Sequence, residues 1–143
     1  MDESTEHIFV YGTLRRGADH PMGAQLETGA TYLGPARWRG RLYSLGPYPA
    51  AVRDAGHTWV LGDLYRLDDP ALLSRLDEYE VLGPDDREGY HRIMDNVHTD
   101  DGPRRAWLYT YTGRVRRRDW IPDGDWLRHK YATPPSQGRP GPI

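Results

Sequence analysis

The carboxylate of Glu80 has the sequence context of a general acid or base. Read as a helix with about 3.6 residues per turn, residues 71–80 place their apolar side chains along one stripe that includes Leu73 and Leu76. Glu80 falls inside this stripe, whereas Glu78 falls on the solvent side. Burial disfavours the charged form of a carboxylate, so an inward Glu80 would exchange protons near neutral pH. A helix that ends at Tyr79, with Glu80 in water or paired with an arginine, is the competing interpretation.

A second candidate is the backbone of Tyr11-Gly12-Thr13-Leu14, which follows the short apolar run 8–11. A buried strand that bends at Gly12 can turn successive N–H groups toward a small anion or a developing oxyanion. The alternative is an ordinary turn between a strand and a loop, because glycine is frequent in such turns.

Other motifs of catalysis and cofactor binding do not occur in the sequence. The absence of cysteine excludes disulfides, thiolate metal sites and a cysteine nucleophile. The spacing of Gly12 and Gly17 matches a phosphate-binding loop, but Ala18 and Asp19 stand where lysine and a hydroxyl residue are required. The six histidines include no H-x-H or H-x-x-x-H pair, and the four serines lack the context of a nucleophile. No G-x-G-x-x-G dinucleotide motif occurs. We therefore expect neither a metal nor another cofactor.

These candidates require a scaffold of short strands. The 16 glycines and 12 prolines are spread along the chain, as is typical of strands joined by turns. The sequence predicts an α+β domain built around a small curled sheet. Its expected parts are strands at 8–11, 39–45 and 58–67 with a bulge at Gly62, a helix opening at Asp69-Pro70, and a hairpin of 91–97 with 104–111.

The length of 143 residues predicts one domain. We expect residues 1–6 to form a flexible N-terminus, 7–131 the domain, and 132–143, with four prolines, a disordered tail. No apolar run is long enough to span a membrane, and the first seven residues are acidic and polar, so we expect a cytoplasmic protein.

Charge is unevenly distributed although the formal net charge is only -2. Residues 68–88 hold eight acidic residues and two arginines, and residues 104–118 hold six arginines and no acid. Two solvated faces of one domain explain this pattern, and no nucleic-acid-binding motif accompanies it, so we expect no nucleic-acid partner. Whether the chain is a monomer or a homodimer does not follow from the sequence.

Several motifs, in order, resemble the γ-glutamylcyclotransferase-like (AIG2-like) family. Each is short, but their order and spacing cover about residues 7–127. The matching segments are Tyr11-Gly12-Thr13-Leu14-Arg15-Arg16-Gly17, Tyr48-Pro49, Val60 to Tyr65, Leu76-Asp77-Glu78-Tyr79-Glu80, Tyr90-His91-Arg92 and Ile121-Pro122-Asp123-Gly124-Asp125-Trp126.

The resemblance implies a small mixed β-barrel with flanking helices and a pocket at one edge. It implies a cofactor-independent reaction in which the α-amine of a small γ-L-glutamyl amide attacks its own γ-carbonyl, releasing 5-oxoproline and a free amine. By the same match, Glu80 is the catalytic acid/base. The substrate-binding residues are Tyr11, Gly12, Thr13, Leu14 and Tyr90.

One departure from the family pattern concerns the residue after Glu80, where Val81 replaces the usual glycine. The segment before Tyr90 is also longer than usual. This rim fits an unusual substrate, such as a γ-glutamylated biosynthetic intermediate that is deprotected. The alternative is a non-catalytic module that keeps the pocket and binds γ-glutamyl compounds without turnover.

Overall fold

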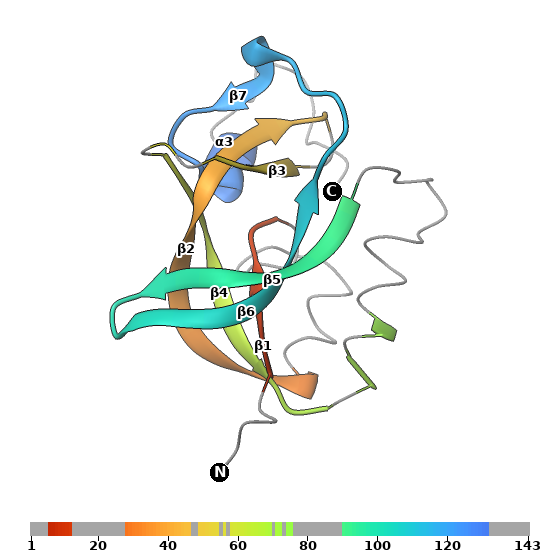
Figure 1. Ribbon diagram of the computed structural model, residues 1–143, viewed down its shortest axis with the longest axis vertical. Helices are drawn as coiled ribbons and strands as arrows, with labels where there is room; N and C mark the ends of the chain where they lie inside the picture. Colours follow the sequence, from red (N-terminus) through yellow and green to blue (C-terminus); the bar gives the residue numbers. More distant parts are fainter. Residues whose placement is uncertain are drawn as a thin grey trace.

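The computed structural model describes residues 6–12, 28–46, 49–54, 56, 58–69, 71–72, 74–75 and 90–131. In the fold of these residues, shown in Figure 1, long curved strands close on themselves and short elements cover one end. The elements are β1 (Glu6–Val10), β2 (Ala30–Ser44), β3 (Pro49–Arg53), β4 (Trp59–Leu67), β5 (Tyr90–Thr99), β6 (Gly102–Tyr111), η1 (Arg117–Asp119), β7 (Trp120–Ile121) and α3 (Trp126–Tyr131).

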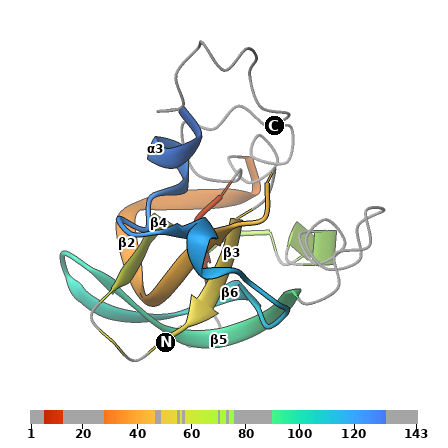
Figure 2. The ribbon, with the colours of Figure 1, turned by 90° about the horizontal axis from the view of Figure 1, so that it is seen from above.

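Five of the strands form a closed barrel. Hydrogen-bonded neighbours follow the order β2-β4-β1-β6-β5, and the pairing of Arg37 on β2 with His98 on β5 closes the ring. The contact between β1 and β6 is parallel, and the other pairings are antiparallel. The predicted mixed barrel is therefore confirmed. Figure 2 shows β3 and α3 lying over the end seen from above.

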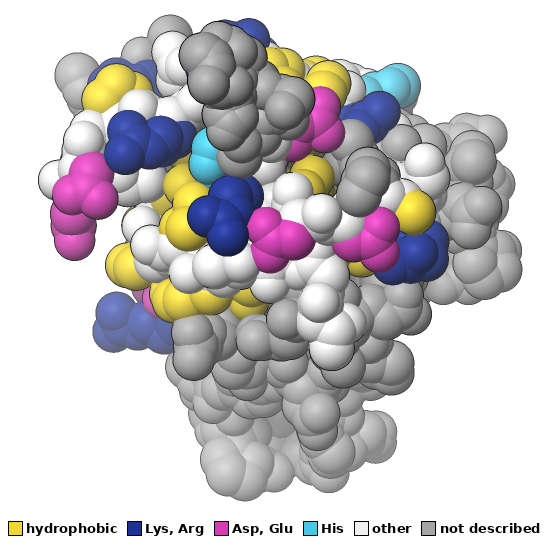
Figure 3. All heavy atoms as spheres, turned by 90° about the horizontal axis from the view of Figure 1, so that it is seen from below, with side chains coloured by type: hydrophobic (Ala, Val, Ile, Leu, Met, Phe, Trp, Pro, Cys, Tyr) yellow, Lys and Arg dark blue, Asp and Glu magenta, His cyan; other side chains and the backbone are white. Residues whose placement is uncertain are grey.

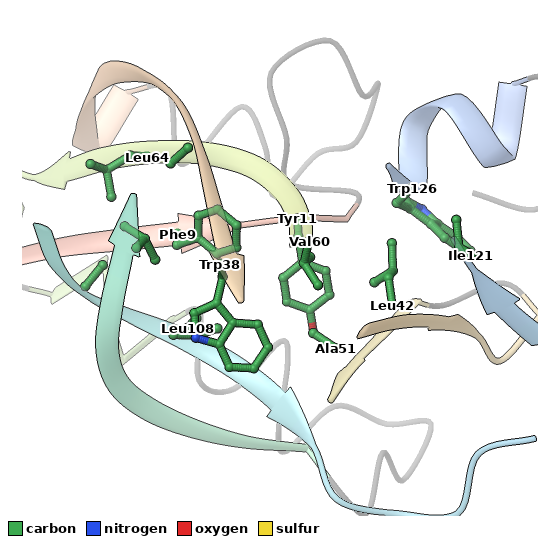
Figure 4. Close-up of a cluster of buried hydrophobic side chains, with 13 residues drawn as sticks. Phe9, Tyr11, Trp38, Leu42, Ala51, Val60, Leu64, Leu108, Ile121 and Trp126 are labelled. Atoms are coloured by element: carbon green, nitrogen blue, oxygen red, sulfur yellow. The ribbon is translucent and has the colours of Figure 1, made fainter. Parts of the chain in front are cut away.

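The barrel interior is filled by aromatic and aliphatic side chains from every wall. Trp38 is 1% exposed, and the indole Nε1–H donates to Asp95 at 3.0 Å. Figure 4 shows Tyr11, Trp38 and Leu108 pointing into the same interior, with Ile121 and Trp126 at one side. The cluster comprises Phe9, Tyr11, Ala36, Trp38, Leu42, Ala51, Val60, Leu64, Val97, Ala106, Leu108, Ile121 and Trp126.

A second apolar cluster lies on alternate residues of the same strands and joins them to Leu72 of the helical segment. Because side chains along a strand alternate between its two faces, one strand can serve both clusters. Phe9 belongs to the first cluster, and its neighbours Ile8 and Val10 belong to the second, together with Ala30, Tyr65 and Tyr109.

The predicted bulge at Gly62 is wrong. Gly62 pairs regularly with Ala36, and the register shifts instead on β2 between Tyr32 and Gly34. Glycine is needed at position 62 for another reason: a Cβ there would lie against the Val10 carbonyl and the Phe9 ring. Gly62 therefore permits close contact between β4 and β1.

The described residues include both edges of the predicted domain. β1 begins at Glu6, which pairs with Leu67, so the strand starts one residue before the predicted domain. The remainder of the predicted N-terminus and the predicted tail, 132–143, lie outside the described residues. Within the described part of the chain, no helix is long and apolar enough to cross a membrane.

Candidate functional site

The candidate site begins where β1 ends, at Tyr11 and Gly12. Tyr11 is 6% exposed, and its hydroxyl donates to the Tyr109 carbonyl at 2.5 Å. Because that hydroxyl is bound to the β6 backbone inside the barrel (Figure 4), Tyr11 fixes the point where the chain leaves the barrel. Any contact of Tyr11 with a ligand in the loop would come from its backbone.

Gly12 lies close to two side chains from distant parts of the chain. A Cβ on Gly12 would lie 2.8 Å from Pro49 Cγ and 4.0 Å from Trp126 Cδ1. The first distance is shorter than a carbon–carbon contact allows. Glycine is thus required by packing at the first bend of the predicted substrate loop.

Tyr90 also contacts Pro49. It is buried, and its hydroxyl donates to the Pro49 carbonyl at 2.5 Å, while its ring lies 5.0 Å from that of Tyr111. The structure therefore brings three of the predicted site residues, Tyr11, Gly12 and Tyr90, to the same end of the barrel. Tyr90 reaches Gly12 through Pro49.

Thr13, Leu14 and Glu80 lie outside the described residues. The start of the helix that precedes Glu80 is described, and Asp69 caps it as predicted. Asp69 Oδ1 accepts from the Ala71 amide at 3.0 Å. This bond and that from Arg75 hold the pKa of the Asp69 carboxyl below its usual value.

The burial pattern of this helical segment follows the predicted phase. Leu72 is fully buried in the second apolar cluster, whereas Ala71, Ser74 and Arg75 are exposed. With Leu73 at 0°, these three residues fall between about 100° and 200°, opposite the predicted apolar stripe.

Trp126 lies beside Gly12 and was not among the residues that the sequence predicted for the site. The turn before it is held against β4, since the Gly124 carbonyl accepts from the Leu61 amide at 2.8 Å. Gly124 has φ +66°, and a Cβ there would collide with the Trp59 carbonyl. Asp125 then caps α3 by accepting from the Arg128 amide at 3.1 Å. The one available signal was that Trp126 ends the last motif of the resemblance.

Two further carboxylates are wholly or partly buried near the barrel strands. Asp63 is 4% exposed and accepts from the Tyr32 hydroxyl at 3.4 Å. Asp95 is desolvated, which raises its pKa, but bonds from Trp38 and the Asn96 amide and the charges of Arg53 and Arg105 outweigh burial and leave the pKa below its usual value. Both carboxylates have polar partners within the wall.

No group of three or more metal-ligating side chains occurs among the described residues. What the described residues offer at this end of the barrel is a chain that leaves β1 at Gly12, beside a wall of buried aromatic side chains. A wall of this kind suits a small ligand.

The fold is a small mixed β-barrel with a glycine bend at one end. Comparison with known proteins gives the family. The family described as "Gamma-glutamyl cyclotransferase, AIG2-like" matches residues 8–128. The chain belongs to this family. The match spans the predicted loop, Glu80 and Trp126.

Individual relatives agree. The chain is 39% identical over 123 residues to the gamma-glutamylcyclotransferase family protein YtfP of Escherichia coli K12, covering 84% of this chain and 95% of that protein. It is 34% identical over 117 residues to a gamma-glutamylaminecyclotransferase of Bos taurus, covering 72% and 64%. The solution structure of E. coli ytfP superimposes with a TM-score of 0.59 at 35% identity, covering 86% of this chain and 97% of that one.

Proposed function

We propose that this protein is an enzyme that releases 5-oxoproline and a free amine from a small γ-L-glutamyl amide. The observation that carries the proposal is the convergence of family and geometry on one loop. The family match includes Tyr11-Gly12-Thr13-Leu14, and the described part of that loop begins at a barrel end where Gly12 lies close to Pro49 and Trp126.

In the proposed reaction the substrate supplies its own nucleophile. Glu80 takes a proton from the α-ammonium group, and the freed amine attacks the γ-carbonyl carbon. The resulting tetrahedral intermediate carries an oxyanion, which backbone amides of residues 11–14 stabilise. As the intermediate collapses, the bond to the leaving nitrogen breaks and Glu80 returns the proton to that nitrogen, while the ring nitrogen passes its second proton to the leaving amine, which departs as an ammonium ion. The products are the five-membered lactam and the amine.

Positioning supplies much of the rate in such a reaction. The attack is intramolecular, so a site that holds the glutamyl chain in a ring-like conformation lowers the barrier by several kcal/mol. A loop held by Tyr11 at one point and packed at Gly12 against Pro49 is suited to this task. The helical phase predicted for residues 71–80 supports an inward Glu80, because the burial or exposure of the four described residues in this segment agrees with that phase.

We propose a γ-glutamyl amine as the substrate class. The Bos taurus relative is named for that class. Amides of this kind include ε-(γ-glutamyl)-lysine and γ-glutamylated biosynthetic intermediates; γ-glutamyl amino acids are the competing substrates.

The test is release of 5-oxoproline from a panel of γ-glutamyl amines and γ-glutamyl amino acids. Wild type should release it from at least one amine, and Glu80→Gln should slow release about 10²- to 10⁴-fold, the range of general acid–base catalysis. Glu78→Gln is the matched control, since it removes a carboxylate two residues away on the predicted solvent side; it should retain activity.

Two results contradict the proposal. Equal loss in both variants would show that Glu80 has no special role. Binding of γ-glutamyl compounds without release from any member of the panel would favour the non-catalytic binding module.

A further inference from the structure

We infer that the indole N–H of Trp126 is a substrate-binding donor, which contacts an oxygen of the γ-glutamyl group beside Gly12. This inference rests on the proposed function and names an additional residue of that site. The first observation is burial without a partner. Trp126 is 2% exposed, and its Nε1 is buried with no hydrogen-bond acceptor among the described residues.

An unsatisfied buried N–H is costly. Removing such a donor from water without a compensating acceptor is unfavourable. Most buried polar groups in folded proteins have partners for this reason, and an exception calls for an explanation. Trp38 shows the usual arrangement in the same cluster, because its indole donates to Asp95 at 3.0 Å.

The location of Trp126 separates it from two other indoles with buried, unpaired N–H groups. Trp107 and Trp120 lie under the guanidinium groups of Arg92 and Arg41, at 4.4 and 5.2 Å from their ring centroids. Neither approaches Gly12 as closely as Trp126 does. An unpaired indole alone therefore does not mark a ligand site, and the argument depends on position.

The edge of Trp126 that faces the loop is the edge that carries the donor. Cδ1 is the ring carbon bonded to Nε1, and it is the Trp126 atom nearest to a Cβ on Gly12, at 4.0 Å. A ligand oxygen beside Gly12 would thus be within reach of a side-chain donor from α3. In a water-excluded site, an added neutral donor strengthens the hold on a carboxylate or an oxyanion.

The position of this donor is fixed by the fold. Gly124 bonds to Leu61 on β4, and Asp125 caps α3, so the backbone that carries the indole is held in place, and the indole itself is 2% exposed among its neighbours. Residue 126 therefore belongs to the same rigid end of the barrel as Gly12 and Pro49. Preorganisation of this kind is what a binding donor requires.

The experiment uses 5-oxoproline as the probe, because this product is shared by every leaving amine. The full-length protein is labelled with ¹⁵N-tryptophan and its indole N–H resonances are followed by NMR as 5-oxoproline is added. One resonance should move downfield on hydrogen bonding. The same resonance should be missing from protein that carries β-(3-benzothienyl)alanine at position 126, an isostere without the N–H.

The isostere should also bind 5-oxoproline about threefold to tenfold more weakly, as expected for one lost hydrogen bond. Trp120→Phe is the matched control, since it removes a buried unpaired indole away from the loop; its affinity should match wild type. The NMR titration of wild type needs no variant to fold, so it stands even if the substituted protein is unstable.

Failure of this inference is distinguishable from failure of the proposed function. If 5-oxoproline binds but the Trp126 resonance stays in place and the isostere binds equally well, Trp126 is a packing residue and the proposed reaction is unaffected. If wild type neither binds 5-oxoproline nor releases it from any γ-glutamyl compound, both are overturned.

Discussion

The two ends of the barrel use polar side chains in opposite ways. At the end near α3, tyrosine hydroxyls are buried and donate to main-chain carbonyls, Tyr11 to Tyr109 and Tyr90 to Pro49. At the other end, Thr31, Arg66 and Asp68 bond to one another at the surface, where the arginine and the aspartate are 46% and 44% exposed. Figure 3 shows basic and acidic side chains side by side on that end.

The difference indicates which end of the barrel holds its backbone in a fixed position. A hydroxyl bound to a carbonyl inside the protein fixes the backbone, and it has little competition from water. A surface network of long side chains keeps its freedom and contributes little to stability. The glycine bend lies at the end with buried bonds, which is the arrangement expected for a site whose backbone does the binding.

The largest effect should come from Gly12→Ala. The added methyl would meet Pro49 Cγ at 2.8 Å, and overpacking of this kind costs about 1–3 kcal/mol of unfolding free energy. Release of 5-oxoproline should fall even where the protein stays folded. Gly56→Ala is the control, because the nearest atom to its Cβ is at 3.4 Å. Urea unfolding measures the loss.

A double substitution sharpens this prediction. Pro49→Ala removes the ring atoms that the new methyl meets, so Gly12→Ala/Pro49→Ala should be more stable than the sum of the two single changes implies. Strict additivity would show that Pro49 is not what restricts position 12.

The next effect should come from removing the buried hydroxyls. Tyr11→Phe and Tyr90→Phe each delete one hydrogen bond to a main-chain carbonyl, which is worth about 1 kcal/mol of unfolding free energy. Tyr90→Phe should also lower activity, although less than Gly12→Ala, because Pro49 loses one anchor. Unchanged stability in both variants would contradict the proposed contrast between the two ends.

Asp95 should make the stability of the barrel sensitive to acid. Its pKa is depressed in the folded protein, since bonds from Trp38 and Asn96 and the charges of Arg53 and Arg105 outweigh its burial. The stabilisation is therefore complete above the unfolded pKa of about 3.9 and is lost as pH falls through the lower folded value.

Asp95→Asn should flatten that part of the stability curve below about pH 5. Urea unfolding across this range measures it, with Asp100→Asn on the exposed β5–β6 turn as the control. A curve for Asp95→Asn that parallels wild type would rule out this contribution.

The smallest effect should come from the exposed network. Arg66→Gln and Asp68→Asn should change the urea midpoint by little, and their coupling should be smaller than the loss in either tyrosine variant. High salt should reduce it further. A coupling energy between Arg66 and Asp68 as large as the loss of stability in Tyr11→Phe would contradict the proposed difference between the two ends.

Local chemistry predicted part of this fold well. The β5–β6 hairpin follows from Asp100-Asp101-Gly102, and Gly102 has φ +110° at the turn. The cap at Asp69 follows from residue type, since an aspartate before a helix can accept an amide of its first turn.

The first half of β2 and the strand β3 were not predicted, because they contain residues that usually interrupt strands. The first half of β2 contains Gly34 and Pro35, and the chain accommodates them with a register shift that leaves Leu33 exposed. β3 is five residues long and begins with a proline, so no period was visible. Strand pairing decides these cases, and a single sequence does not contain it.

The candidate site likewise contains residues that the sequence predicted and one that it did not. Gly12 and Tyr90 were found from the motif order, and the structure places both against Pro49. Trp126 is 114 positions from Gly12 along the chain, and no local period connects them. They come close together because of the turn at Gly124. Only glycine fits there, since a Cβ would collide with the Trp59 carbonyl on β4, and this is visible only in the folded chain.

The most direct test of the central claim is the origin of the oxygen in the product. A γ-glutamyl amine is converted in ¹⁸O-labelled water, and the products are analysed by mass spectrometry. Intramolecular attack by the α-amine predicts 5-oxoproline with no ¹⁸O, together with the free amine. Glutamate that carries ¹⁸O in its γ-carboxylate, or 5-oxoproline labelled through it, would identify a hydrolase and contradict the account.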